Sequence, residues 1–127
     1  LMDAWIKKHE NNIEFIFSNN DAMALGALKS IQKEGYNIGD NNKFIAIVGV
    51  DAIPEVIEEI KKSAILGTVL QSPKDQAKAI VDMVMNVVND KDVVDGTGYT
   101  LDEVKAVRVP YKAITIENVD DAMDAYK

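Results

Sequence analysis

Polar side chains follow three predicted strands, each at the point where an apolar run ends. Asn20 follows the first run, Asp51 the second and Gln71 the third. Because the carboxyl ends of parallel strands meet at one edge of a sheet, we expect these side chains to lie close together. Two amides and one carboxylate offer several hydrogen-bond donors and acceptors but a single charge. This set suits a neutral ligand rich in hydroxyl groups, whereas a phosphate site would need a glycine-rich loop and a Lys or Arg.

Each of these residues also has a purely structural interpretation. Asn and Asp are good helix N-caps, so Asn20 and the neighbouring Asp21 can each cap the helix after the first strand. For Asp21 we favour capping over ligand contact, and for Asn20 the two roles weigh equally. Asp51 can cap the helix that begins at Pro54, and Gln71 can be an ordinary loop residue. Their shared position at successive strand ends favours the binding role for the set.

Other candidate groups are better explained by structural roles. His9 is expected at the surface, Arg108 in an ion pair, and Trp5 and Tyr99 in packing contacts. Glu14, within an otherwise apolar strand, is interpreted as a solvent-facing edge residue. The sole His is remote from every strand end and only one carboxylate faces the edge, so the paired groups of acid–base catalysis are missing. We therefore expect that the chain is not an enzyme.

Alternating strands and helices position the three polar residues. Apolar runs at 13–18, 44–50 and 65–70 predict strands, and helical patterns separate them. Pro54, at the first position of the second of these helices, has no N–H that the helix would need. Strands that alternate with helices imply an α/β fold with a parallel sheet and right-handed crossovers.

A long amphipathic helix is predicted after Ser72-Pro73. Its apolar stripe is expected to be buried and consists of Ala77, Ile80, Val81, Val84, Val87 and Val88. A polar loop at 89–98 follows, and apolar residues alternate over 104–116. Because Pro110 cannot donate in a central ladder, we expect a crossing segment or an edge strand there. A short helix is expected near the end of the chain.

Composition narrows the possible partners. The 127 residues carry a formal net charge of -7 and no Cys, so we expect no nucleic-acid partner, and disulfides and thiolate metal sites are excluded. No apolar run approaches the roughly 18–20 residues of a membrane span. Since the sequence opens inside a helical pattern and without Met, we expect it to be a piece of a longer chain.

Four segments at their observed spacing resemble a known receptor family. They are residues 19–27, which read Asn-Asn-Asp-Ala-Met-Ala-Leu-Gly-Ala, residues 48–55, which read Val-Gly-Val-Asp-Ala-Ile-Pro-Glu, and residues 67–70 and 107–111. Together they resemble the C-terminal part of the bacterial galactose/glucose-binding proteins, the solute receptors of methyl-galactoside ABC importers. The resemblance covers essentially the whole chain. It implies a parallel-sheet three-layer sandwich, the type I periplasmic-binding-protein fold.

The resemblance also implies roles for individual residues. Asn20 and Asp51 match family residues that hydrogen-bond sugar hydroxyls. Gln71 stands where the family has an Asn that also contacts the sugar, and its extra methylene changes the geometry of that contact. Glu14 matches a Glu that ligates a structural Ca²⁺, whose other ligands would lie upstream of this chain. The resemblance thus replaces the edge interpretation of Glu14 with a partial metal site.

A division into lobes is implied as well. Residues 1–70 would belong to the C-terminal lobe, 71–107 to the N-terminal lobe, and 108–127 would cross the hinge and return. The apolar stripe on the long helix would then lack the sheet it packs on, unless another chain or another part of the protein supplies it.

The implied partners are D-galactose or D-glucose, an ABC transporter permease and, in some relatives, a chemoreceptor. The implied location is the periplasm, or the outer surface of a Gram-positive cell with a lipid anchor. Two other functions stay open at this point. One is the effector domain of a sugar-responsive transcriptional repressor, which would carry a DNA-binding module upstream. The other, disfavoured by the missing second catalytic group, is a small enzyme that uses Asp51 as a base.

Overall fold

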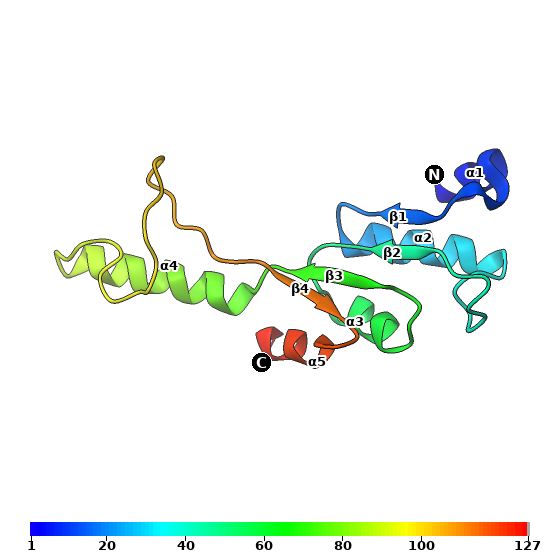
Figure 1. Cartoon of the computed structure of the whole chain (residues 1–127). Coiled ribbons are helices and arrows are strands. Elements are labelled where there is room, and N and C mark those ends of the chain that lie inside the picture. The colour runs from blue at the N-terminus through cyan, green and yellow to red at the C-terminus, as the bar shows by residue number, and fades with distance from the viewer. Residues whose placement is uncertain (127) are drawn as a thin grey trace.

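Four strands form one sheet in the order β1-β2-β3-β4 in the computed structural model, which describes residues 1–126 (Figure 1). β1 (Phe15–Phe17), β2 (Ala46–Val48) and β3 (Gly67–Leu70) are parallel, and β4 (Lys112–Thr115) is antiparallel to β3. The predicted α/β fold with a parallel sheet is confirmed. The segment after Pro110 forms the antiparallel edge strand.

The helices include those predicted between the strands, after Ser72-Pro73 and near the end of the sequence. They are α1 (Met2–His9), α2 (Asp21–Lys33), α3 (Pro54–Lys61), α4 (Pro73–Val88) and α5 (Val119–Met123), with 3₁₀ turns η1 (Glu10–Asn12) and η2 (Asp124–Tyr126). Ser72 caps α4, because its hydroxyl accepts the N–H of Asp75 at 3.1 Å. Within the described residues, each helix is too short or too polar to span a membrane.

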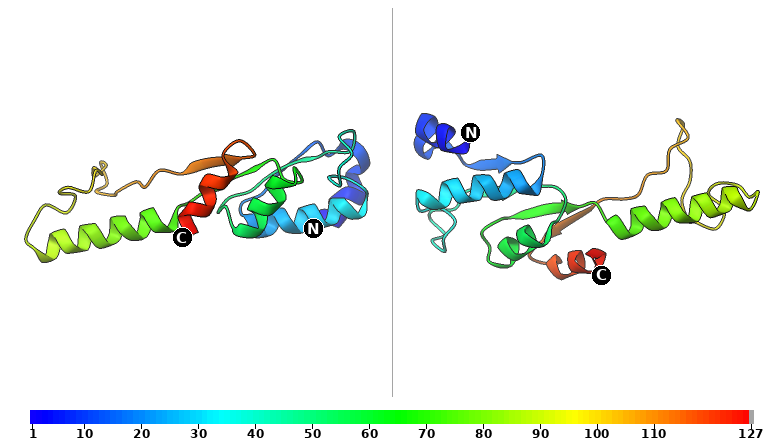
Figure 2. Two further views of the ribbon diagram at one scale, coloured as in Figure 1. Left: turned by 90° about the horizontal axis from the view of Figure 1, so that it is seen from below. Right: turned by 180° about the vertical axis from the view of Figure 1, so that it is seen from behind.

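The hydrophobic core lies on one face of the sheet. Ile47 and Ile114 on this face are fully buried, and α2 lies against β1 and β2, while α3 packs beside α5 (Figure 2). The helices contribute Ala24, Leu28, Ile31, Val56, Ile57 and Ile60, each at most 3% exposed. Burying an Ile or Val side chain contributes about 1.5–3 kcal/mol, so this face holds the sheet and helices together. On the opposite face, Phe15 and Phe17 are 52% and 74% exposed.

α4 leaves the sheet and projects away from its end, and the chain returns beside it as an extended segment (Figures 1 and 2). The prediction that its apolar stripe is buried is wrong. The exposed fractions are 59% for Ile80, 58% for Val81, 54% for Val84, 59% for Val87 and 68% for Val88. A single extended segment covers one side of a helix, where Ala79 is 1% exposed, and leaves the remaining apolar face open. Within residues 1–126 no sheet covers this stripe, as the resemblance implied.

Because the apolar stripe of α4 is exposed, a charged side chain introduced there should have little effect on stability. Replacing Val84 with Lys should change the free energy of unfolding of this chain by less than about 0.5 kcal/mol, because the position is solvent-accessible. The control Ala79→Asp, on the buried side of the same helix, should destabilise by about 1–3 kcal/mol. Urea denaturation measures both. Equal losses for the two variants would contradict the exposed stripe, and a loss at Val84 that grows with protein concentration would indicate self-association through it.

Candidate ligand-binding edge of the sheet

The loops that follow β1, β2 and β3 form one continuous edge. The N–H of Asp21, after β1, donates to the carbonyl of Val50 at 2.8 Å. The N–H of Asp51, after β2, donates to the carbonyl of Val69 in β3, also at 2.8 Å. These bonds continue the parallel pairing beyond the ends of the strands. The three predicted binding residues therefore lie along the same edge.

Asp51 sits in a strained loop. Its φ is 118°, and that of Ala52 is 59°, both in the left-handed region that L-residues adopt at a cost of about 1–3 kcal/mol each. The residue does not cap α3, whose N-cap is Ile53 without a side-chain capping bond. Its half-buried carboxylate makes no hydrogen bond to another described residue. The loop thus presents a carboxylate that is available to a ligand.

Asn20 and Gln71 flank this carboxylate along the edge. Asn20 caps α2, because its Oδ1 accepts the N–H of Met23 at 2.9 Å. Capping occupies only the oxygen, so the Nδ2 group of Asn20 can still donate two hydrogen bonds. Gln71 is half-buried, and its side-chain amide has no hydrogen-bond partner within residues 1–126. Both residues therefore retain polar atoms for a ligand.

The prediction that Asp21 caps the helix after the first strand is wrong. Asp21 is the first residue of α2 rather than its cap, and it is fully buried. Its Oδ2 accepts the N–H of Ile53 at 2.9 Å, and its Oδ1 accepts the hydroxyl of Thr68 at 2.6 Å. A Cβ at Gly49 would lie 2.2 Å from Asp21 Oδ1, so only glycine leaves room for this carboxylate. The glycine before Val50 was the one signal in the sequence that pointed to such a close approach.

Burial raises the pKa of Asp21 above its ordinary value of 3.8. Hydrogen bonds from Thr68 and from the backbone of Ile53 oppose the rise, and the nearby charge of Asp51 adds to it. The Tyr126 hydroxyl faces the same loop and donates to the Asp51 carbonyl at 3.2 Å. Its pKa is also raised, first by burial and then by the charges of Asp21 and Asp51. A carboxylate at position 21 is therefore held in the fold against an electrostatic penalty.

The raised pKa of Asp21 predicts that the stability of the fold depends on pH. The folded chain binds the Asp21 proton more tightly than the unfolded chain, so the contribution of Asp21 is complete below pH 3.8 and is lost as the pH rises through its elevated pKa. Asp21→Asn should remove this decline, which appears in the wild-type-minus-variant difference of urea unfolding free energies against pH. Asp102 provides a control of opposite sign, because hydrogen bonds from the backbone of Ala106 and from Arg108 lower its pKa. A flat difference curve for Asp21 would contradict the prediction.

Glu14 precedes β1 and is exposed. Ca²⁺ takes 6–8 oxygen ligands, whereas within residues 1–126 no group of three acidic or histidine side chains is placed to hold a metal ion. The described residues therefore do not form a calcium site by themselves. The assignment of Glu14 as one Ca²⁺ ligand stays a prediction that depends on ligands from elsewhere.

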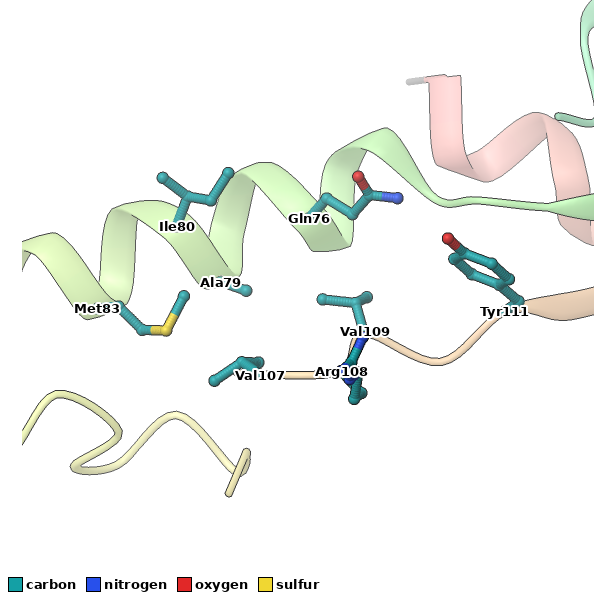
Figure 3. A pocket seen from close by; sticks show the side chains of 8 residues that line it. All are labelled: Gln76, Ala79, Ile80, Met83, Val107, Arg108, Val109 and Tyr111. Carbon is teal, nitrogen blue, oxygen red and sulfur yellow. The ribbon is translucent and has the colours of Figure 1, made fainter. Parts of the chain in front are cut away.

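A separate groove of about 510 Å³ lies between α4 and the returning segment (Figure 3). It is lined by Gln76, Ala79, Ile80, Met83, Val107, Arg108, Val109 and Tyr111. Its charged residue is engaged, because the Nε of Arg108 donates to Asp102 Oδ2 at 2.9 Å, which confirms the predicted ion pair. We interpret this groove as incomplete cover of α4, and the strand-end loops as the candidate site.

The periplasmic binding protein domain family matches residues 1–92. The D-galactose/methyl-galactoside binding periplasmic protein MglB of Haemophilus influenzae is 39% identical over 121 residues, which are 94% of this chain and 34% of that protein. The xylitol-binding protein of Mycolicibacterium smegmatis is 28% identical over 97% of this chain and 31% of its own length.

The fold is similar to that of a solved periplasmic solute binding protein. An ABC transporter periplasmic solute binding protein from Actinobacillus succinogenes, with bound D-allose, has a TM-score of 0.75 at 22% identity, over 94% of this chain and 36% of that one. At this identity the likeness concerns the fold alone, and it agrees with the predicted type I fold. The chain spans about a third of the length of the relatives it matches.

Proposed function

Because this chain belongs to the periplasmic binding protein family, we propose that it supplies one wall of the sugar-binding cleft in the extracytoplasmic receptor of an ABC importer. The proposed ligand is D-galactose or D-glucose. The observation that carries the proposal is the Asp51 carboxylate, held in a left-handed loop at the strand edge without a hydrogen bond to another described residue. The 39% identity to a galactose-binding relative supports the choice of sugar.

The three edge residues divide the recognition of hydroxyl groups. Asp51 accepts hydrogen bonds from two sugar hydroxyls, and such charge-assisted bonds are about twice as strong as neutral ones. Asn20 donates through Nδ2, since its oxygen is engaged in the α2 cap. Gln71 both donates and accepts. A single charge among these groups favours a neutral sugar over a phosphorylated one.

The opposite wall of the cleft lies in residues outside this chain. We propose that 71–107 belong to the N-terminal lobe, and the exposed stripe on α4 supports this because it needs a sheet that residues 1–126 do not supply. The two lobes then close over the sugar by a hinge movement. In the same complete receptor, Glu14 contributes one Ca²⁺ ligand, and the closed form is recognised by the permease and, where present, by a chemoreceptor.

Calorimetric titration of the complete gene product tests this function. D-galactose or D-glucose should bind with about micromolar affinity or better, near -8 kcal/mol, and glucose 6-phosphate should bind far more weakly. The 127-residue chain alone should bind weakly, since one wall is missing. If the complete protein binds the phosphorylated sugar and neither neutral sugar, the proposed function is wrong.

A further inference from the structure

We propose that Asp21 is a positioning residue for the sugar site. Its buried carboxylate holds the loop 50–53 in the conformation that presents Asp51 to the ligand. The inference rests on the sugar-binding role proposed above, and it assigns the function of that site in part to a residue that a bound sugar does not touch.

The geometry shows how a buried group acts on the loop. Both amides that directly follow Asp51 are bound by a pair of buried side chains. The N–H of Ile53 donates to Asp21 Oδ2 at 2.9 Å, and the N–H of Ala52 donates to Thr68 Oγ1 at 3.3 Å. The Thr68 hydroxyl in turn donates to Asp21 Oδ1 at 2.6 Å. The Asp21 carboxylate therefore binds one loop amide directly and orients the hydroxyl that binds the other. Its partners Ile53 and Thr68 lie 32 and 47 residues away in the sequence.

The loop needs such a restraint. Asp51 and Ala52 both have positive φ, a conformation that persists only where the surroundings enforce it. Ala52 is fully buried, so its amide cannot exchange its protein partner for water without opening the loop, and Ile53 beside it is half-buried. If the carboxylate at position 21 is removed, the loop is expected to relax toward ordinary φ values and to carry the Asp51 side chain away from the edge.

A role in stability alone does not explain the Asp21 carboxylate, because its burial costs free energy. Asp21 is fully buried, without an ion pair among the described residues, and Gly49 is required to leave it space. Burying a charged group costs free energy that a neutral, well-packed group would not. A role in fixing the loop in advance of binding accounts for this expense, because a preorganised site loses less free energy on binding.

The chain offers a matched control at the other end of the same sheet. Asn37 is 5% exposed, and its side chain bonds Ile45 N and O, both at 2.7 Å, and Ala64 O at 2.9 Å. Its φ of 52° suits replacement by Gly. Asn37→Gly therefore removes a buried polar clamp of similar extent, far along the sheet from the loop 50–53.

The test is sugar affinity of the complete gene product at a temperature where circular dichroism shows each variant folded. Asp21→Ala should weaken galactose binding at least about tenfold, because the apparent affinity falls with the fraction of molecules that keep the loop 50–53 in its binding conformation. Asp21→Asn keeps an acceptor for Ile53 and a donor toward Thr68, and should remain within about threefold of wild type. Asn37→Gly should lower the unfolding midpoint and leave affinity unchanged. Equal affinities for Asp21→Ala and Asn37→Gly would overturn the proposal.

A second measurement does not depend on the ligand. Hydrogen exchange in the 127-residue chain should show the Ala52 and Ile53 amides exchanging at least about tenfold faster in Asp21→Ala than in Asn37→Gly. Unchanged exchange at these amides would overturn the restraint itself. If wild type binds no sugar while exchange responds as expected, the sugar function fails, and with it the positioning of a sugar site, but the restraint of the loop by Asp21 stands.

Discussion

Replacing Asp51 with Ala is expected to weaken sugar binding at least about tenfold, since hydrogen bonds to a charged group contribute about 1.5–3 kcal/mol and each 1.4 kcal/mol is tenfold in affinity. The fold should survive, because the half-buried Asp51 side chain bonds to no other described residue. Asp51→Asn tests the charge alone, and Asn also tolerates the positive φ of this position. Calorimetry on the complete gene product gives the dissociation constants.

The control for Asp51 is Glu55→Gln, an exposed acid in the first turn of α3. It changes the net charge by the same amount and should leave affinity as in wild type. If both Asp51 variants bind galactose as tightly as Glu55→Gln does, the assignment of Asp51 to the sugar is wrong. If all three bind more weakly, the effect is long-range electrostatics rather than contact.

The largest loss of stability is expected from Gly67→Ala. A Cβ at this position would lie 2.6 Å from the carbonyl oxygen of Ile114 in β4, which is backbone held by the β3–β4 pairing. Since neither strand can move without breaking that pairing, we expect a loss of at least about 2 kcal/mol in the free energy of unfolding. Urea denaturation of the 127-residue chain measures it.

Gly26→Ala is the matched control for this substitution. Gly26 lies inside α2 with nothing within 4 Å of an added Cβ. Because alanine is the better helix former, this variant should be more stable than wild type by about 0.5–1 kcal/mol. Opposite signs for the two Gly→Ala changes would confirm the β3–β4 geometry, and a neutral Gly67→Ala would contradict it.

Much of the fold was accessible from the sequence because its signals are local. Apolar runs between turn residues predicted the strands, and the periodic apolar residues predicted the helices. The edge that carries Asn20, Asp51 and Gln71 followed from one topological rule, that parallel strands end on the same side. The lobe boundaries, the sugar contacts and the role of Glu14 stay predictions.

Two errors share a physical cause. Periodicity shows that α4 has an apolar face, but not what covers it, and Val84 and Val88 are exposed because cover is a property of the neighbours. Asp21 has the sequence context of a helix cap, and its partner Thr68 is 47 residues away. A local pattern cannot distinguish a surface acceptor from one that a distant strand encloses.

The turn η2 connects two parts of the molecule that are far apart in the sequence. η2 packs against α4, and the hydroxyl of its Tyr126 is anchored to the Asp51 carbonyl. We therefore expect a rotation of α4 about its junction with β3 to disturb the contact between this turn and the loop 50–53. η2 is thus a physical link between α4 and the backbone of Asp51, so we expect a change in the position of one to be transmitted to the other.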